Sequence, residues 1–455
     1  MKTLSRVLTI LATGLLVAGV QGQTSERSPV STRAALSHTA MTASYPETIA
    51  LKIDLEAARS LGSNERLPLN LALVIDRSGS MGEQSKMEHA MRAARLLVEN
   101  LSERDIVSII AFGEGATVLS PAGLAVNKQF LNHRLSEVHP DGPTNLSAGL
   151  LEAFAQIDSK ASEDQIKRVI VLTDGVANRG VTSRTKLGRI VETARDKGIG
   201  VSTLGCGEKF DEKMLMQLAE VGGGRYTYIS SPEQIPEAMA KELGGLLNVV
   251  AQNVTVEVKA IAGFEITSID GWIMDQPRTT FTFDLGDLRE GDHGILLLEL
   301  ERRDFSTGKT AQIETIFTLD PTDTGQRVQG VVSLKAPMIN DQARARASAN
   351  QSVVYYAQVI EAVTKAEDAI LGLDNRRYQD AARRFEQMYD QARKFAIDTR
   401  DQQLLNQMFI FKHLMTELAQ ASSAVHGHDD ARQQLKKEVE YQRYLRTHHR
   451  PRREK

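Results

Sequence analysis

The stretch Leu71-Ala72-Leu73-Val74-Ile75-Asp76-Arg77-Ser78-Gly79-Ser80 decides the fold. Its first half is entirely apolar, as expected for a strand that is covered on both faces in a parallel sheet. Its second half contains Asp76, Ser78 and Ser80, and Gly79 lets the backbone turn tightly between the two serines. The stretch therefore predicts a buried strand of an α/β sheet that ends in a loop carrying several oxygen ligands.

The sequence around this stretch alternates strands with helices. Further apolar runs predict strands at 106–112, 169–172 and 199–204. Between them apolar residues recur at intervals of three and four, as in 87–101, which is typical of helices covering a sheet. Repeated β–α units of this kind predict a mainly parallel, doubly wound, Rossmann-like sheet.

Outside this region the pattern changes twice. Alternation of apolar and polar residues predicts an antiparallel β-sandwich, and long apolar stripes then predict a helical region. Residues 49–55 also alternate, and we expect this strand to pair with the sandwich, so that the α/β domain is inserted in it. Residues 23–46 lack periodicity and are predicted to be a flexible leader. The predicted parts are a signal peptide (1–22), the leader and first strand (23–66), the α/β domain (67–248), the β-sandwich (249–336), the helical region (337–424) and a basic tail (425–455).

The N-terminus has the pattern of a secretory signal. Lys2 and Arg6 precede an apolar stretch, Val7 to Val20, and the small residue Gly22 permits cleavage after it. The apolar stretch is shorter than the roughly 20 residues that span a membrane, although an uncleaved anchor stays the alternative. We therefore expect an exported protein, periplasmic or secreted, with no transmembrane segment beyond the signal.

Composition narrows the classes of partner. The 455 residues are 41% hydrophobic and 25% charged, as in an ordinary globular protein, and the net charge of -3 gives no indication of a nucleic-acid partner. The only cysteine, Cys206, excludes an internal disulfide and is expected to be buried at a strand end. The tail from Arg432 to Lys455 is predicted to be solvated, with contact to an anionic envelope surface as the alternative.

Three loops are expected to bring oxygen atoms to one place. Asp76 and Asp174 each follow a buried strand, and Thr144 lies in a loop bent by a glycine and a proline. Ligands of doubly wound sheets bind beyond the carboxyl ends of the strands, where these loops meet. With Ser78 and Ser80, the loops supply two carboxylates and three hydroxyls.

Such a set of hard oxygen donors suits Mg²⁺ or Mn²⁺. Because it contains few strong donors, one coordination position remains for a carboxylate from another protein. Each loop alone is equally consistent with ordinary turn residues. Their occurrence together on this sheet pattern favours a metal site.

These loops also carry a resemblance to a known family. The stretch 73–81, with the loops of Thr144 and Asp174, resembles a von Willebrand factor A domain with its metal-ion-dependent adhesion site. The resemblance covers about residues 67–247, and the β region that follows is similar to exported bacterial proteins of this type. In that family five residues hold Mg²⁺ directly or through water. The resemblance implies this role for Asp76, Ser78, Ser80, Thr144 and Asp174.

The sequence is consistent with three kinds of function to different degrees. The resemblance implies a non-enzymatic, metal-dependent adhesion or assembly module that binds an Asp or Glu of a partner protein. A metal-dependent phosphoesterase with Asp76 as nucleophile would need a second aspartate at position 78, where Ser78 stands, and Ser80 lacks the G-x-S-x-G frame of a serine hydrolase. We therefore expect no enzyme. The remaining alternative is a scaffold with a purely structural metal, which binds through its β and helical regions.

Overall fold

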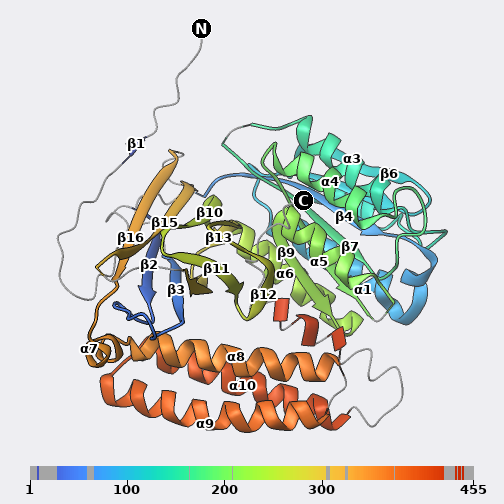
Figure 1. The fold of residues 1–455 in the computed structure, drawn as a ribbon. Helices are drawn as coiled ribbons and strands as arrows, with labels where there is room; N and C mark the ends of the chain where they lie inside the picture. Colours follow the sequence, from blue (N-terminus) through green and yellow to red (C-terminus); the bar gives the residue numbers. More distant parts are fainter. Residues whose placement is uncertain are drawn as a thin grey trace.

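The computed structural model describes residues 8–9, 28–58, 66–162, 164–207, 209–303, 308–322, 326–372, 375–424, 436–437, 439–441 and 443–444. They form an α/β domain, a β-sandwich and a helical region (Figure 1). The predicted signal peptide lies outside the described residues, apart from Leu8 and Thr9, which form β1 (Leu8–Thr9) beside β16.

The α/β domain is built on a six-stranded sheet of order β6-β5-β4-β7-β8-β9. All neighbouring strands are parallel except β5 and β6, which confirms the predicted doubly wound fold. The strands are β4 (Leu69–Asp76), β5 (Ile106–Phe112), β6 (Ala116–Leu124), β7 (Ile166–Thr173), β8 (Ile199–Cys206) and β9 (Gly223–Ile229). The helices are η1 (Gly79–Ser85), α1 (Lys86–Asn100), α2 (Lys128–Leu135), α3 (Leu146–Asp158), α4 (Arg184–Arg195), α5 (Glu212–Val221), η2 (Pro232–Gln234) and α6 (Ile235–Leu247).

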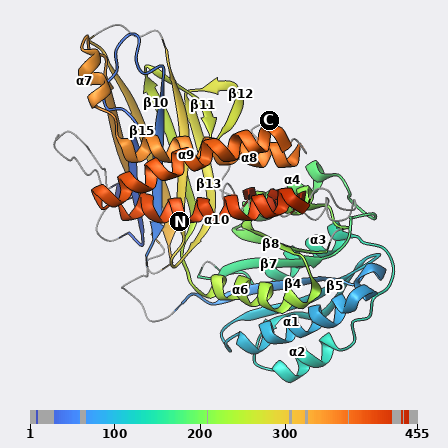
Figure 2. The same ribbon diagram turned by 90° about the horizontal axis from the view of Figure 1, so that it is seen from below.

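Strand β4 is buried along its whole length because helices cover both faces of the sheet (Figure 2). Leu71 and Leu73 share a core with residues of α1, α2 and α6, whereas Ala72 and Val74 share one with residues of α3, α4 and α5. Cys206 is buried at the end of β8, as the sequence predicted. Because these strands are buried on both faces, the polar side chains of the predicted site lie at their carboxyl ends and in the loops that follow.

The sandwich consists of two sheets, ordered β1-β16-β15-β10-β13 and β12-β11-β14-β3-β2. Its strands are β2 (Val30–Leu36), β3 (Thr48–Ala57), β10 (Val249–Ala262), β11 (Phe264–Ile269), β12 (Trp272–Arg278), β13 (Thr280–Arg289), β14 (His293–Arg302), β15 (Thr310–Pro321) and β16 (Val328–Pro337). The strand expected at 49–55 is part of β3, which pairs with β14 and β2. The α/β domain is thus inserted between two strands of the sandwich.

Strand β2 corrects the prediction of a flexible leader over residues 23–46, of which 23–27 lie outside the described residues. Its residues pair with β3, and burial alternates along it with Val30, Thr32, Ala34 and Leu36 inside. Two of these four residues, a threonine and an alanine, contribute little to an apolar pattern. The alternation is consequently hidden in the sequence and becomes visible only when β3 supplies the partner strand.

The helical region covers one face of the sandwich. It contains α7 (Gln342–Ala347), α8 (Gln351–Leu371), α9 (Asn375–Thr399) and α10 (Gln402–Ala424). The last three helices lie side by side below β2 and β3 in Figure 1, and their core includes Leu297 of β14. Within the described ranges, no helix has the length and apolar character needed to cross a membrane.

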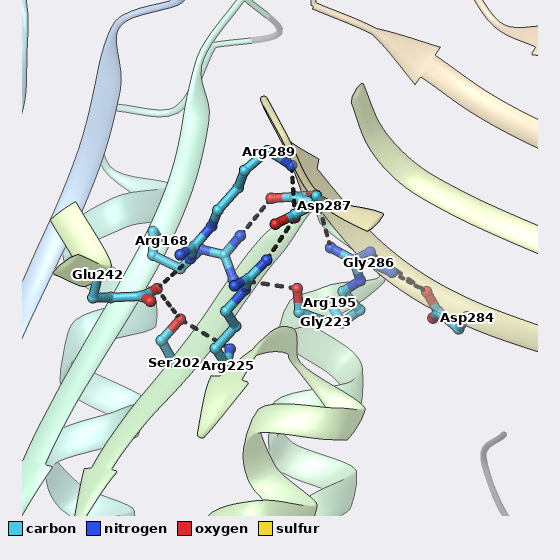
Figure 3. A network of polar contacts seen from close by, with 11 residues as sticks. Arg168, Arg195, Ser202, Gly223, Arg225, Glu242, Asp284, Gly286, Asp287 and Arg289 are labelled. Carbon is cyan, nitrogen blue, oxygen red and sulfur yellow. Dashed lines mark hydrogen bonds and ion pairs between the residues drawn. The ribbon is translucent and has the colours of Figure 1, made fainter. Parts of the chain in front are cut away.

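A buried polar network joins the α/β domain to the sandwich (Figure 3). Arg168 of β7 is 1% exposed and forms an ion pair with Asp287 of β13. Glu242 of α6 accepts a hydrogen bond from Nη2 of Arg289 at 2.8 Å. Buried charges are costly unless paired, so these pairs hold the two domains in one relative position. No periodic pattern in the sequence indicated this contact.

The described residues between 436 and 444 correct the prediction of a solvated basic tail, and the rest of 425–455 lies outside the described residues. Val439 and Tyr444 are buried, and the hydroxyl of Tyr444 accepts a hydrogen bond from the amide of Tyr226 in β9 at 2.8 Å. Nε of Arg443 donates to Glu367 of α8 at 3.0 Å. Aromatic rings among the basic residues provide apolar surface that the α/β domain covers, so this segment links the helical region to β9.

Glu212 makes this contact sensitive to pH. Burial and then the negative charge of Glu440 raise the pKa of its carboxyl from 4.5 to about 8. The stabilising contribution of the protonated form is complete below pH 4.5 and is lost as the pH rises through 8. We expect the free energy of unfolding, measured with urea, to fall over this range, and Glu212→Gln to flatten the fall. Glu237→Gln, at an exposed carboxyl, should leave the slope unchanged; an equal slope in both variants would contradict the expectation.

Candidate metal centre

The two carboxylates of the candidate site lie at the same edge of the parallel sheet. Asp76 is the last residue of β4, and Asp174 follows the last residue of β7. The two strands are paired in register, with Ile75 opposite Leu172. Both aspartates are buried, at 0% and 1% exposure. The sheet therefore places them side by side, as the topology predicted.

Backbone hydrogen bonds shape the loop after β4. The amide of Ser78 donates to Oδ1 of Asp76 at 2.8 Å, and the amide of Gly79 donates to the carbonyl of Gly142 at 3.0 Å. Gly142 has a φ of +81°, a conformation that glycine adopts readily. The first loop is thereby attached to the loop of Thr144, whose amide donates to Oδ1 of Asn178 at 2.9 Å.

All five predicted side chains come together at this edge. Oγ of Ser80 donates to Oδ1 of Asp174 at 2.7 Å and lies 3.2 Å from Oγ of Ser78. A Cβ atom placed on Gly175 would lie 3.2 Å from Oγ1 of Thr144 and 3.7 Å from both Oδ2 of Asp76 and Oγ of Ser80. Glycine at this position thus leaves the converging oxygens free of a side chain.

The donor chemistry fits a small divalent cation. Two carboxylates and three hydroxyls are hard oxygen ligands of the kind that Mg²⁺ and Mn²⁺ take. The described part of the chain contains no cluster of three or more His, Cys, Asp or Glu, so any metal here relies on hydroxyl groups for several of its ligands. Burial raises the pKa of Asp76 despite opposing hydrogen bonds from Thr173 and Ser78. A cation beside it would relieve that cost of burying the charge.

Two further residues contact the site and were not assigned a role from the sequence. Oγ1 of Thr173 donates to Oδ2 of Asp76 at 2.5 Å, which satisfies the second oxygen of that carboxylate. Nζ of Lys86 lies 2.6 Å from Oδ2 of Asp174. The sequence offered only an indirect signal for Lys86, which stands just before the predicted helix 87–101, where the helix dipole disfavours a lysine.

Comparison with known proteins identifies the domain that carries this site. Residues 70–241 match the family model of the von Willebrand factor type A domain. YfbK of Escherichia coli is 29% identical over 257 residues, which are 55% of this chain and 44% of that protein. The chain therefore spans less than half the length of this curated relative.

Two solved structures have a similar fold. The von Willebrand factor type A protein from Catenulispora acidiphila has a TM-score of 0.62 at 16% identity, covering 85% of this chain and 91% of that one. The ArnB paralog VWA2 from Sulfolobus acidocaldarius has a TM-score of 0.57 at 15% identity, covering 93% and 100%. The likeness extends beyond the α/β domain to the sandwich and helices. Together with the family match, it establishes that residues 70–241 of this chain are a von Willebrand factor type A domain.

Proposed function

We propose that this protein is a non-enzymatic, divalent-metal-dependent protein-binding module. Domains of this family are often metal-dependent protein-interaction modules. The observation that carries the proposal is the convergence of Asp76, Ser78, Ser80, Thr144 and Asp174 at one sheet edge, with only two carboxylates among them. These residues would hold Mg²⁺ or Mn²⁺, and the metal would supply a positive charge for an Asp or Glu of a partner.

Export is part of the same proposal. It rests on the pattern of residues 1–22, with basic residues before a short apolar stretch. The partner would then be a protein of the envelope or the external medium. The fraction from which the partner is recovered therefore bears on the location as well as on the binding.

Affinity capture from envelope and culture fractions tests the binding. We expect a partner to be retained by the wild-type protein with Mg²⁺ and lost with EDTA or in Ser78→Ala/Ser80→Ala. The double variant removes two hydroxyl ligands and keeps both carboxylates. Ser136→Ala/Ser159→Ala is the matched control, because these exposed serines of the same domain donate to carbonyls of their own helices, at 2.6 and 2.7 Å. Equal capture by all proteins, with and without EDTA, would contradict the proposal.

The scaffold alternative receives support from exposed apolar residues on α10. Phe409 and Ile410 are 54% and 57% exposed. In the same capture experiment, Phe409→Ser/Ile410→Ser separates the two functions without removing any element. If Phe409→Ser/Ile410→Ser still captures the partner and Ser78→Ala/Ser80→Ala does not, the partner binds at the metal site. If the serine variant captures the partner and the α10 variant does not, the partner binds at the helical region.

A further inference from the structure

Lys86 is unusual for the first residue of a helix. It is 5% exposed, and its Nζ lies 2.6 Å from Oδ2 of Asp174 and 3.4 Å from the carbonyl oxygen of Ser80. A positive charge at a helix N-terminus opposes the helix dipole. Burial of that charge is also costly unless it is paired. Neither helix formation nor packing accounts for a lysine here, whereas its contact with Asp174 does.

The two residues before Lys86 have an unusual backbone conformation, which directs Lys86 toward Asp174. Gln84 and Ser85 have φ values of 53° and 57°, in the left-handed region that residues other than glycine rarely adopt. Ser85 makes no side-chain cap for the helix that follows. The turn brings Lys86 back to the carboxylate that Ser80 also contacts. Strain of this kind persists where the surrounding structure maintains it, commonly at functional sites.

The buried side chains around the site carry less negative charge than a divalent cation would need for neutralisation. Asp76 and Asp174 contribute two negative charges, and Lys86 cancels one of them. Glu83 lies 4.0 Å from Nζ of Lys86, but its side chain is 56% exposed and it also contacts Lys209. The buried charge of the site is therefore minus one. A divalent cation held there would keep one positive charge uncompensated by the protein.

We propose that Lys86 is a positioning residue that holds Asp174 and maintains this shortage of negative charge. It lowers the affinity of the site for the metal alone and raises the affinity of the metal-loaded site for a carboxylate. The inference rests on the proposed function and adds to it the reason that an acidic partner is preferred. Charges interact strongly at this range in a buried site, because little water screens them.

Titrations of the full chain with Mn²⁺ and then with acetate test the proposal. Free Mn²⁺ is measured by its electron paramagnetic resonance signal, and acetate binding by the fall in water-proton relaxation as it displaces metal-bound water. We expect Lys86→Met and Lys86→Gln to bind Mn²⁺ at least about tenfold more tightly and acetate at least about tenfold more weakly. Lys86→Arg keeps the charge and should resemble the wild type. A purely structural role would weaken both affinities.

Lys209→Met is the matched control. It removes the same charge from a side chain that is 75% exposed and whose Nζ lies 3.5 Å from Oε2 of Glu83. We expect it to change neither affinity. Circular dichroism checks the fold of each variant. The two neutral variants differ in one respect, because the side-chain amide of glutamine can still donate a hydrogen bond to Asp174 and the thioether of methionine cannot.

The outcomes separate this inference from the proposed function. Weaker Mn²⁺ binding by both neutral variants would overturn the inference. Mn²⁺ binding without a response to acetate in the wild type would refute the acidic ligand, while tighter Mn²⁺ binding by the neutral variants would still support the charge effect. If the wild type bound no Mn²⁺, binding by Lys86→Met would support Lys86 as a competing cation. Absence of binding in every variant would overturn both.

Discussion

Asp76→Asn is expected to weaken Mn²⁺ binding by at least about a hundredfold, because it removes one of the two carboxylates of the site. Asparagine keeps the shape of the side chain, and its oxygen can still accept from the amide of Ser78. Isothermal titration calorimetry measures the loss directly. Asp174→Asn should act in the same direction.

The stability of the same variant tells whether the metal binds a preformed site. Burial raises the pKa of Asp76, so its charged form costs free energy of folding at neutral pH. In EDTA the variant should therefore be at least as stable as the wild type. Saturating Mn²⁺ should raise the melting temperature of the wild type only, since a ligand that binds the folded state stabilises it. If Asp76→Asn fails to fold, the metal is structural and the scaffold alternative gains support.

Arg168→Met is expected to destabilise the protein by about 3–5 kcal/mol, as is typical when one partner of a buried ion pair is removed. Arg168 is almost fully buried, and the side chain of its partner Asp287 is 6% exposed. Glycine at positions 200 and 224 makes room for the guanidinium, since a Cβ on either would lie 2.5 or 2.6 Å from Nη1 of Arg168. Arg168 is therefore tightly enclosed at this interface, beside the pair of Glu242 and Arg289.

Urea unfolding followed by circular dichroism measures the effect. Arg184→Met is the matched control, because its ion pair with Asp211 is at the surface and its side chain is 48% exposed. We expect that control to cost about 0–1 kcal/mol. Arg168→Met/Asp287→Leu should recover much of the loss, since no unpaired charge then remains buried. A loss below about 1 kcal/mol for the single variant would mean that the network does not hold the domains together.

Much of the candidate site could be predicted because its residues follow elements that local patterns reveal. The apolar run before Asp76 predicts a buried strand, and the run before Asp174 predicts another. Parallel strands in one sheet end at one edge, and the two carboxylates are close because β4 and β7 are neighbours in the sheet. Thr144 and the serines were assigned from their loops and from the family resemblance.

Lys86 could not be assigned a role in the same way. A lysine among the charged residues of an amphipathic helix is usually solvated, and no periodic signal distinguishes this one. Its role depends on the left-handed backbone at Gln84 and Ser85, which the residue types do not predict. The buried threonine and alanine of β2 were hidden for a related reason, since their burial depends on a partner strand.

The sequence by itself indicated most strands and helices of the α/β domain, its doubly wound class and, with the family resemblance, the five oxygen-bearing residues, because periodicity and loop chemistry depend on neighbouring residues. Only the tertiary structure decided which distant residues meet, such as Arg168 with Asp287 and Tyr226 with Tyr444. Charged and aromatic residues have many potential partners along a chain. The packing of the domains selects one of them, because a buried charge or hydroxyl must be satisfied where it lies.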